Sequence, residues 1–538
     1  MPYPSERNYD GIIIGAGHHG LILGSYLARA GLKILLLDRR MMYGGGLNTV
    51  EATVPGFYHN LHSINHFHIS ETPWFKDLGL DARVEYLTPE HEFAQPYLDG
   101  KCMVLGRNLD ATCASIARFS KKDAQTFRDW NAKAEAITQE IFLPERFAEP
   151  LPAAERNALL QRTQAGRDFL AVTQRQPFDL VDELFESDRV KLIFLFKVSL
   201  FGTWLVDTLN KTSPMGSVIR AFDLQTGYQL CKGGSYNLAR GLMESFIAAG
   251  GTFLNQVHVE RILIEGGKAT GVTTSDGRTF RARQFVASTV DVQQTFEHFV
   301  GREQFPEAFR AKVSNYKHTE WTLFGVHLAL SEMPQFTAAA FDPNIQHTLK
   351  LCIGSETMND LLTAFEEVKQ GKAPTTVQFG GGVLSAVDPT QAPPGKHTAY
   401  AWHVMPFKPD VGAQSQADFE AAFAERIVER WAQYAPNVNR KTILGKYVYT
   451  ARHYAEEIYN MRSGDIFMGT FSADQVMDRH FGYRSPIPNL YMAGSAGHPG
   501  GAISGGAGYI SAGLIAKDLG VKLWWQPVDA RRALERVA

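Results

Sequence analysis

The chain opens with a hydrophobic pattern typical of two short strands joined by a helix. Residues 10–14 form an apolar run of strand length, and residues 33–38 form a second one that ends in an acid. Between them lie glycines in the spacing G-x-G-x-x-G, at Gly15, Gly17 and Gly20, followed by a helix-compatible run. This arrangement predicts one βαβ unit with a dinucleotide-binding turn. A glycine-rich turn in some other α/β fold is the alternative.

Each residue of this turn has a physical reason to be there. Gly15 permits the tight turn, Gly17 lets the backbone approach a pyrophosphate, and Gly20 lets the helix lie close to the strand. The N-terminus of the helix offers free N–H groups and a partial positive charge to the phosphates. Asp38 stands where a ribose diol is held, and His18 is counted among the cofactor-binding residues.

A second glycine cluster follows the acid. Arg39, which we also expect to be a cofactor-binding residue, comes directly after Asp38, and Gly44, Gly45 and Gly46 lie a few positions beyond it. A nicotinamide-binding unit does not require this cluster. In flavoproteins of the glutathione-reductase type, a second glycine turn here lets the backbone pass beside the phosphates and ribityl chain of the cofactor. A plain β-turn is the other interpretation.

The middle of the chain alternates between helical and strand-like patterns. Residues 105–225 are mainly helical and predict an inserted cap, in which residues 190–206 lack a clear polar face. Such a segment is buried core, lines a channel for an apolar substrate, or touches lipid. Further strands and one amphipathic helix are predicted at 257–264, 268–274, 284–288, 322–330, 397–405 and 419–431.

Near the C-terminus a short strand runs into a loop of small residues. The loop contains Gly494, Gly500, Gly501 and Ala502, and a helix of small residues follows it. Small side chains allow the backbone to lie against a large planar ligand. The N-terminus of the following helix can stabilise negative charge on such a ligand. His498 in the same loop is a candidate proton-transfer residue or a structural histidine.

The amino-acid composition argues against several classes of protein. The 538 residues carry a formal net charge of −2, which argues against a nucleic-acid partner because phosphate binding needs a basic face. The four cysteines, none of them in a C-x-x-C pair, predict neither a disulfide framework nor a zinc site and suit a reducing compartment. With no room for a signal peptide before the first strand and no long apolar run, we expect a cytoplasmic protein without a transmembrane helix.

Taken together, these motifs resemble one flavoprotein family. The segments 15–21, 44–49, 54–57 and 494–501 are similar to those of phytoene-desaturase-type flavoproteins. The nearest branch is the one named after pyridine nucleotide-disulphide oxidoreductase domain-containing protein 2. Carotene desaturases usually have an arginine after the paired glycines, where this chain has Gly46. That departure argues against a simple transfer of carotenoid chemistry.

The resemblance implies an architecture and a cofactor. It implies an α/β fold, α+β overall, with a Rossmann-type FAD-binding domain of the glutathione-reductase or amine-oxidase kind. A mixed domain of sheet and helices for the substrate interrupts it. The expected FAD-binding parts are 1–90, 226–300 and 455–525, the substrate or cap parts are 91–225 and 301–454, and a tail follows at 526–538. By resemblance, Val259 presents its backbone to the adenine of FAD.

Histidines supply the candidate catalytic residues. The segment 59–68 contains several, and in the resembling family it passes near the flavin ring, which makes His62 and His66 candidates for substrate-facing groups beside His498. Histidine is also the commonest metal ligand. No acid or cysteine pattern completes a metal site here, so we expect none.

The expected activity follows from the same resemblance. It is an FAD-dependent dehydrogenase or desaturase that takes a hydride from a C–H bond of a hydrophobic or aromatic small molecule to flavin N5. A flavin-dependent isomerase or saturase, a nicotinamide-only dehydrogenase and a non-catalytic FAD-binding assembly protein are the alternatives. The electron acceptor, oxygen, a quinone or another carrier, stays open, as do peripheral membrane contact and homo-oligomer formation.

Overall fold

In a computed structural model of the protein, the apolar run at the start of the chain forms β1 (Tyr9–Ile14). This strand is fully buried inside a seven-stranded sheet. Strands β8, β2, β1 and β11 pair in this order as a parallel sheet, and β17 pairs with the end of β11. The first part of β11 continues into an antiparallel meander with β10 and β9. The bounds are β2 (Ile34–Leu37), β8 (Thr252–Leu254), β9 (Val259–Glu265), β10 (Lys268–Thr274), β11 (Thr279–Ser288) and β17 (Leu490–Met492). The structure describes residues 8–173, 175–199, 219, 222–223, 227–319 and 321–536.

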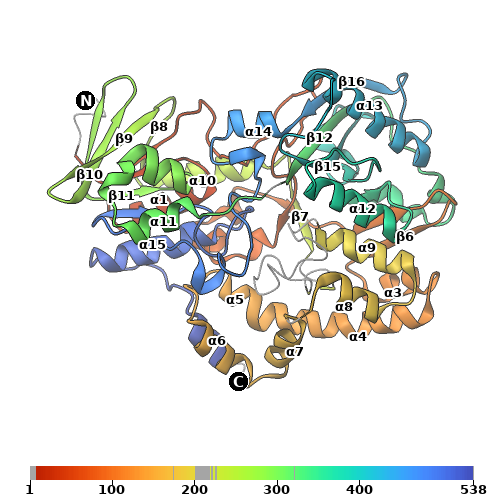
Figure 1. Cartoon of the computed structure of the whole chain (residues 1–538), viewed down its shortest axis with the longest axis horizontal. Coiled ribbons are helices and arrows are strands. Elements are labelled where there is room, and N and C mark those ends of the chain that lie inside the picture. Colours follow the sequence, from red (N-terminus) through yellow and green to blue (C-terminus); the bar gives the residue numbers. More distant parts are fainter. Residues whose placement is uncertain are drawn as a thin grey trace.

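Three helices pack together against this first sheet. The helix α1 (His18–Arg29) begins directly after Gly17 and is buried along nearly its whole length. It contacts both α10 (Tyr236–Ala248) and α15 (Gly506–Asp518), although α15 lies almost at the other end of the chain. Figure 1 shows these segments, red, yellow-green and blue, gathered in one lobe together with α11 (Glu307–Ser314).

A second seven-stranded sheet forms the other lobe (Figure 1). Its order is β16-β12-β15-β14-β13-β5-β6, antiparallel except where β13 meets β5. The helices α12 (Met358–Lys369) and α13 (Gln416–Tyr434) pack on it. The strands predicted at 322–330 and 397–405 and the helix at 419–431 are confirmed. The strand bounds are β5 (His91–Pro96), β6 (Cys102–Gly106), β12 (Trp321–Leu330), β13 (Lys350–Ile353), β14 (Phe379–Val383), β15 (His397–Pro406) and β16 (Ile443–Tyr449).

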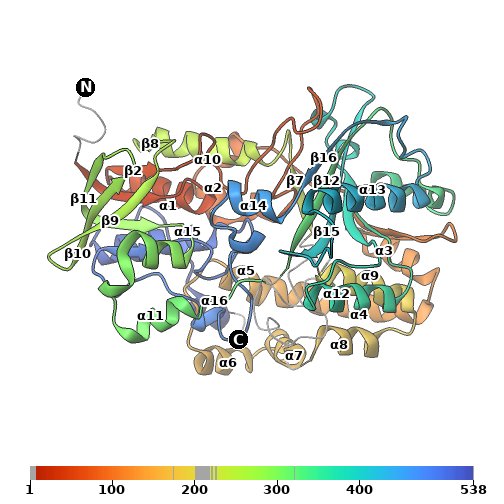
Figure 2. The same cartoon turned by 45° about the horizontal axis from the view of Figure 1, so that its top comes forward.

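The predicted helical cap lies along one edge of the molecule in both views (Figures 1 and 2). Residues 192–199 of the segment without a polar face are buried in the cap core as part of α9, and residues 200–206 lie outside the described residues. The last helix, α16 (Ala530–Arg536), contacts α5 and α6. No described helix is long and apolar enough to cross a bilayer. The cap helices are α3 (Leu109–Ala117), α4 (Lys121–Ile137), α5 (Leu143–Glu145), α6 (Ala153–Leu160), α7 (Gln164–Val172), α8 (Pro177–Leu184) and α9 (Asp188–Ser199).

Between the lobes the chain crosses several times. The first sheet takes strands from 9–37, 252–288 and 490–492, and the second from 91–106 and 321–449. A small sheet of β3 (His66–Phe67), β7 (Tyr228–Cys231) and β4 (Tyr86–Leu87) and the helix α14 (Ala451–Glu457) lie at this junction (Figures 1 and 2). Residues at these crossings are therefore placed to contact a ligand held between the two sheets.

Candidate functional site

A large cavity lies where the two lobes meet. It contains about 1870 Å³ of space that no protein atom fills, its open mouth included. Gly15 and Asp38 line it from the first lobe, and Lys350 and Trp402 line it from the second. The cavity therefore lies between the two sheets and is lined by residues of both.

The first glycine turn forms one end of the cavity. Gly15 has a φ of +100°, which strongly favours glycine, and Gly17 precedes the first residue of α1. A Cβ on Gly20 would overlap the carbonyl oxygen of Gly15, so this glycine allows the helix to approach the strand. A Cβ on Gly17 would have Gly45 Cα, 3.9 Å away, as its nearest neighbour. The structure therefore has free space beside Gly17, whereas a backbone atom already occupies the position that a Cβ on Gly20 would take.

The second glycine turn packs against the first. Gly44 has a φ of +103°, and its N–H donates to the carbonyl oxygen of Ala16 at 2.8 Å. Gly45 and Gly46 line the cavity, whereas Gly44 and Gly20 support the turns from behind it. The two turns form a continuous backbone wall with few side chains.

Asp38 connects the two turns. It follows β2, and its carboxylate accepts hydrogen bonds from the N–H groups of Ala16 and Arg40, both at 2.8 Å. Burial raises the pKa of Asp38, and these two N–H groups oppose the increase. The guanidinium of Arg39, also at the cavity, lies 3.2 Å from the ring centroid of Tyr459 and donates to the carbonyl oxygens of Glu456 and Glu457.

Two further predicted residues reach the same cavity from distant parts of the chain. Val259, at the start of β9, lines it together with Val257 and His258. Ala502 lines it from the C-terminal loop with Ile503, and its φ of +76° is unusual for a residue with a Cβ. His18 also contributes, and burial lowers its pKa to about 3.

Comparison with known proteins identifies the family to which the chain belongs. The model of the family described as flavin containing amine oxidoreductase matches residues 20–319, more than half of the chain. The chain belongs to this family.

Relatives support the same family assignment over nearly the whole length. One of the limonene dehydrogenase subunits of Castellaniella defragrans is 30% identical over 97% of this chain and 97% of its own. The mouse pyridine nucleotide-disulfide oxidoreductase domain-containing protein 2 is 28% identical, over 96% and 94%. A lycopene-forming phytoene desaturase of Paracoccus sp. is 26% identical, over 94% and 97%. The predicted resemblance to phytoene-desaturase-type flavoproteins is confirmed.

A solved structure confirms the predicted fold class. Cyclohexylamine oxidase from Brevibacterium oxydans superposes with a TM-score of 0.58 at 16% identity, covering 96% of this chain and 100% of that one. The described chain thus has the α/β fold of this family, with a Rossmann-type FAD-binding part and a mixed sheet-and-helix part.

As a member of the flavin-containing amine oxidoreductase family, the protein is an FAD-dependent oxidoreductase, and its cavity fits FAD. The open space at Gly17 suits a ligand that lies against bare backbone. The carboxylate oxygens of Asp38 each accept one N–H and keep capacity for a further donor. Nε2 of His18 is buried without a hydrogen-bond partner among the described residues, which leaves it available to a polar ligand atom.

The other predicted residues of the C-terminal loop lie behind the cavity. A Cβ on Gly494 would lie 2.5 Å from the carbonyl oxygen of Thr289, and a Cβ on Gly501 would overlap that of Phe467. Gly500 and His498 line a smaller separate cavity. Nε2 of His498 lies 2.7 Å from the carbonyl oxygen of Glu145, so its ring is held by the cap. These residues shape the loop that brings Ala502 to the main cavity.

His62 and His66 both line the main cavity of this family member. Burial lowers the pKa of each to about 3, so both imidazoles are neutral near pH 7. Nδ1 of His66 lies 2.6 Å from the hydroxyl oxygen of Tyr86, and Nε2 of His62 lies 3.3 Å from that of Tyr449. The second ring nitrogen of each has no partner among the described residues, which suits a polar contact with a ligand. The described chain contains no group of His, Cys, Asp and Glu suited to a metal ion.

Sequence reasoning missed a set of cavity-lining residues outside the glycine turns, which we call the aromatic wall. This wall is largely aromatic and carries one buried lysine. A charged residue inside the apolar run 349–353 was a local signal for Lys350, but no local pattern indicated that Trp402, among the alternating residues of β15, faces the cavity. The wall includes Phe67, Tyr228, Lys350, Trp402, Tyr454 and Phe471.

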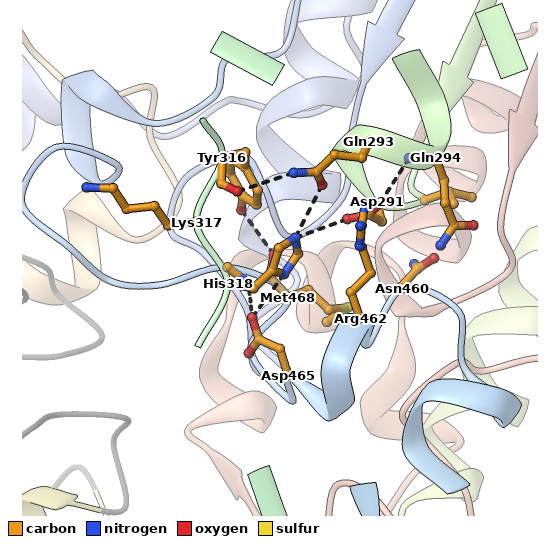
Figure 3. Close-up of polar contacts among 12 residues, drawn as sticks. Asp291, Gln293, Gln294, Tyr316, Lys317, His318, Asn460, Arg462, Asp465 and Met468 are labelled. Atoms are coloured by element: carbon orange, nitrogen blue, oxygen red, sulfur yellow. Dashed lines mark hydrogen bonds and ion pairs between the residues drawn. The ribbon is translucent and has the colours of Figure 1, made fainter. Parts of the chain in front are cut away.

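Beside the cavity, a buried cluster of charged residues holds together segments that connect the two sheets (Figure 3). His318 lies just before β12, with Nε2 3.4 Å from Asp291 and Nδ1 3.2 Å from Asp465. Asp291 follows β11, and both carboxylates are buried. Burial lowers the pKa of His318, but the hydrogen bonds to the two carboxylates outweigh it and raise the pKa to about 9. The imidazolium therefore joins the first sheet to the segment that returns from the second.

Proposed function

We propose that the protein is a dehydrogenase or desaturase that removes hydrogen from a C–H bond of a hydrophobic small molecule. One observation carries the proposal: a single cavity is lined both by bare glycine backbone and by several aromatic side chains. The names of two relatives, limonene dehydrogenase and phytoene desaturase, support a substrate of this chemical class.

We assign the FAD-binding side as follows. The backbone of Gly15 and Gly17 and the N-terminus of α1 would hold the diphosphate. Asp38 would accept from a ribose hydroxyl, and Val259 would contact the adenine. Gly45, Gly46 and Ala502 would border the rest of the cofactor. When bound, FAD would accept the hydride that leaves the substrate C–H bond, and the substrate would also release a proton from the neighbouring carbon to water, which leaves a double bond.

The chain's own residues bind and orient the substrate. Aromatic side chains such as Trp402 and Tyr228 would bury its apolar body and exclude water, so that the reactive C–H bond is held in one position. His62 and His66 would be neutral hydrogen-bonding groups, kept in orientation by Tyr449 and Tyr86. We give His498 a structural part in the loop, because its ring contacts the cap.

The electron acceptor and the cellular location are part of the proposal. Oxygen, a quinone or another carrier would receive the electrons. All four cysteines are free and buried, which supports a reducing, cytoplasmic location, with peripheral membrane contact allowed. Fractionation of cells into soluble and membrane parts, followed by oxidation of the reduced protein with oxygen and with a soluble quinone, tests both points.

The test of the function uses purified holoenzyme. We expect the yellow absorbance of bound FAD, and we expect it to bleach when a cyclic terpene hydrocarbon such as limonene is added without oxygen. A primary amine of similar size serves as the comparison, because it tests the reaction named in the family description. The product should be two hydrogen atoms lighter than the substrate by mass spectrometry.

Other outcomes of this experiment identify other functions. Conversion of the substrate to an isomer without loss of hydrogen would show an isomerase. Retained FAD that no hydrocarbon or amine reduces would favour a binding or assembly protein. Bleaching by the amine alone would show an amine oxidase and overturn the proposed substrate class.

A further inference from the structure

Lys350 is an unusual residue for an apolar wall. It begins β13, between Leu349 and Leu351, is only 8% exposed, and lines the main cavity. Its Nζ lies 3.6 Å from the ring centroid of Tyr228, which itself belongs to the aromatic wall. The aromatic face stabilises a cation, but no residue of the described ranges accepts a hydrogen bond from the Lys350 ammonium.

The nearby carboxylate, that of Glu92, forms an ion pair with a different lysine. Glu92, on the adjacent strand β5, pairs with Lys197 of α9 at 3.9 Å, and both side chains are almost fully buried. Within the described part of the chain, no carboxylate lies within ion-pair distance of the Lys350 Nζ, although the charge of Glu92 still acts on it. The cluster thus has two amines for one carboxylate, and it carries one surplus positive charge when all three groups are ionised.

This surplus charge is costly without a partner. A buried ammonium that lacks acceptors loses its hydration, and burial lowers the pKa of Lys350 to about 7. Cys352 offers no counter-charge, since burial raises the pKa of its thiol well above the usual value. A ligand that brings one negative charge to this wall would balance the cluster.

We propose that Lys350 binds a carboxylate of the substrate, so that the substrate is an amphipathic molecule with an apolar body and one acidic group. A carboxylate matches the single surplus charge and offers oxygen acceptors to the N–H donors left free above Tyr228. The aromatic wall receives the apolar body. This inference rests on the proposed function for the reaction, but binding to Lys350 can be measured without any reaction.

The test compares two probes on the holoenzyme by calorimetry: limonene, and perillic acid, which carries a carboxylate on the same skeleton. We expect perillic acid to bind at least about 10-fold more tightly than limonene at pH 6, as a charged hydrogen bond predicts. In Lys350→Met, whose side chain suits the apolar surroundings, perillic acid should lose about 10- to 100-fold in affinity and limonene should change little. Lys101→Met, at an exposed position directly before β6 of the same sheet, is the matched control.

The pH dependence gives a second readout that needs no variant. The carboxylate stays ionised above pH 6, while the Lys350 ammonium, facing Glu92, Lys197, Cys352 and Tyr228, loses its proton near pH 7. The affinity of wild type for perillic acid should therefore fall about tenfold between pH 6 and pH 8. Lys350→Arg keeps its charge, so it should retain binding and lose this pH dependence.

The outcomes separate this inference from the proposed function. Equal affinity of the two probes, or an unchanged perillic acid affinity in Lys350→Met, would overturn the role of Lys350 even if limonene bleaches the flavin. Conversely, Lys350-dependent binding of perillic acid without bleaching by either probe would keep the carboxylate site and contradict the proposed reaction.

Discussion

Replacing Gly17 with alanine is expected to weaken FAD binding by at least about 100-fold while leaving the fold intact. Gly17 has a φ of −70°, which alanine adopts without strain, and the added Cβ would meet no protein atom closer than 3.9 Å. The methyl group would instead enter the space that we assign to the diphosphate. Loss of two backbone hydrogen bonds to a charged group, at about 1.5–3 kcal/mol each, accounts for an effect of this size.

The measurement is the dissociation constant for FAD of the apo-protein, together with its thermal unfolding midpoint. Gly513→Ala is the matched control, because Gly513 lies inside α15, its added Cβ would be 3.7 Å from the nearest side chain, and it does not line the cavity. That control should bind FAD normally and unfold at a slightly higher temperature. Wild-type FAD affinity in Gly17→Ala would show that the diphosphate lies elsewhere.

Replacing His318 with leucine is expected to lower the free energy of unfolding by about 3–5 kcal/mol near pH 7. The substitution leaves two buried carboxylates, Asp291 and Asp465, without the imidazolium between them (Figure 3). Arg462, 3.6 Å from Asp291, and backbone N–H groups around Asp465 compensate in part. Urea unfolding measures the change, and His347→Leu at an exposed position is the control, with an expected effect within about 0.5 kcal/mol.

The His318 effect should depend on pH in a defined direction. Its folded-state pKa of about 9 lies above the ordinary value of 6.5, so its stabilisation is complete below pH 6.5 and is lost as the pH rises through 9. The difference in unfolding free energy between wild type and His318→Leu should therefore shrink by about 3 kcal/mol across this window. The pKa of Asp465 is lowered despite burial, so its contribution is lost instead as the pH falls below 3.8. A difference that stays constant from pH 6 to pH 10 would contradict a charged His318.

The parts of the molecule that the sequence predicts are those whose signal is local. The spacing of Gly15, Gly17 and Gly20 spans six residues and belongs to a strand and a helix that are adjacent in the chain, so the pattern alone indicates the turn. The alternation in 397–405 and the amphipathic period in 419–431 likewise need no knowledge of distant residues.

The remaining features depend on contacts between distant segments. His318 and Asp465 are 147 residues apart, and no pattern around either one indicates the other. The glycine-rich motif at the C-terminus predicts a loop near the ligand, but the direction of the His498 ring is set by the carbonyl group of Glu145, 353 residues away. For Lys350, the apolar run predicts a buried strand, while the cavity that the lysine faces exists only after β13 pairs with β5.

The position of β17 near the end of the chain bears on when, relative to synthesis, the protein can bind its cofactor. This strand, residues 490–492, completes the parallel part of the first sheet beside β11, and the loop after it brings Ala502 to the cavity. A chain still being synthesised on the ribosome cannot close the cavity until these last segments have emerged. FAD loading is therefore expected to follow translation, and a chain truncated before residue 490 should be released without flavin.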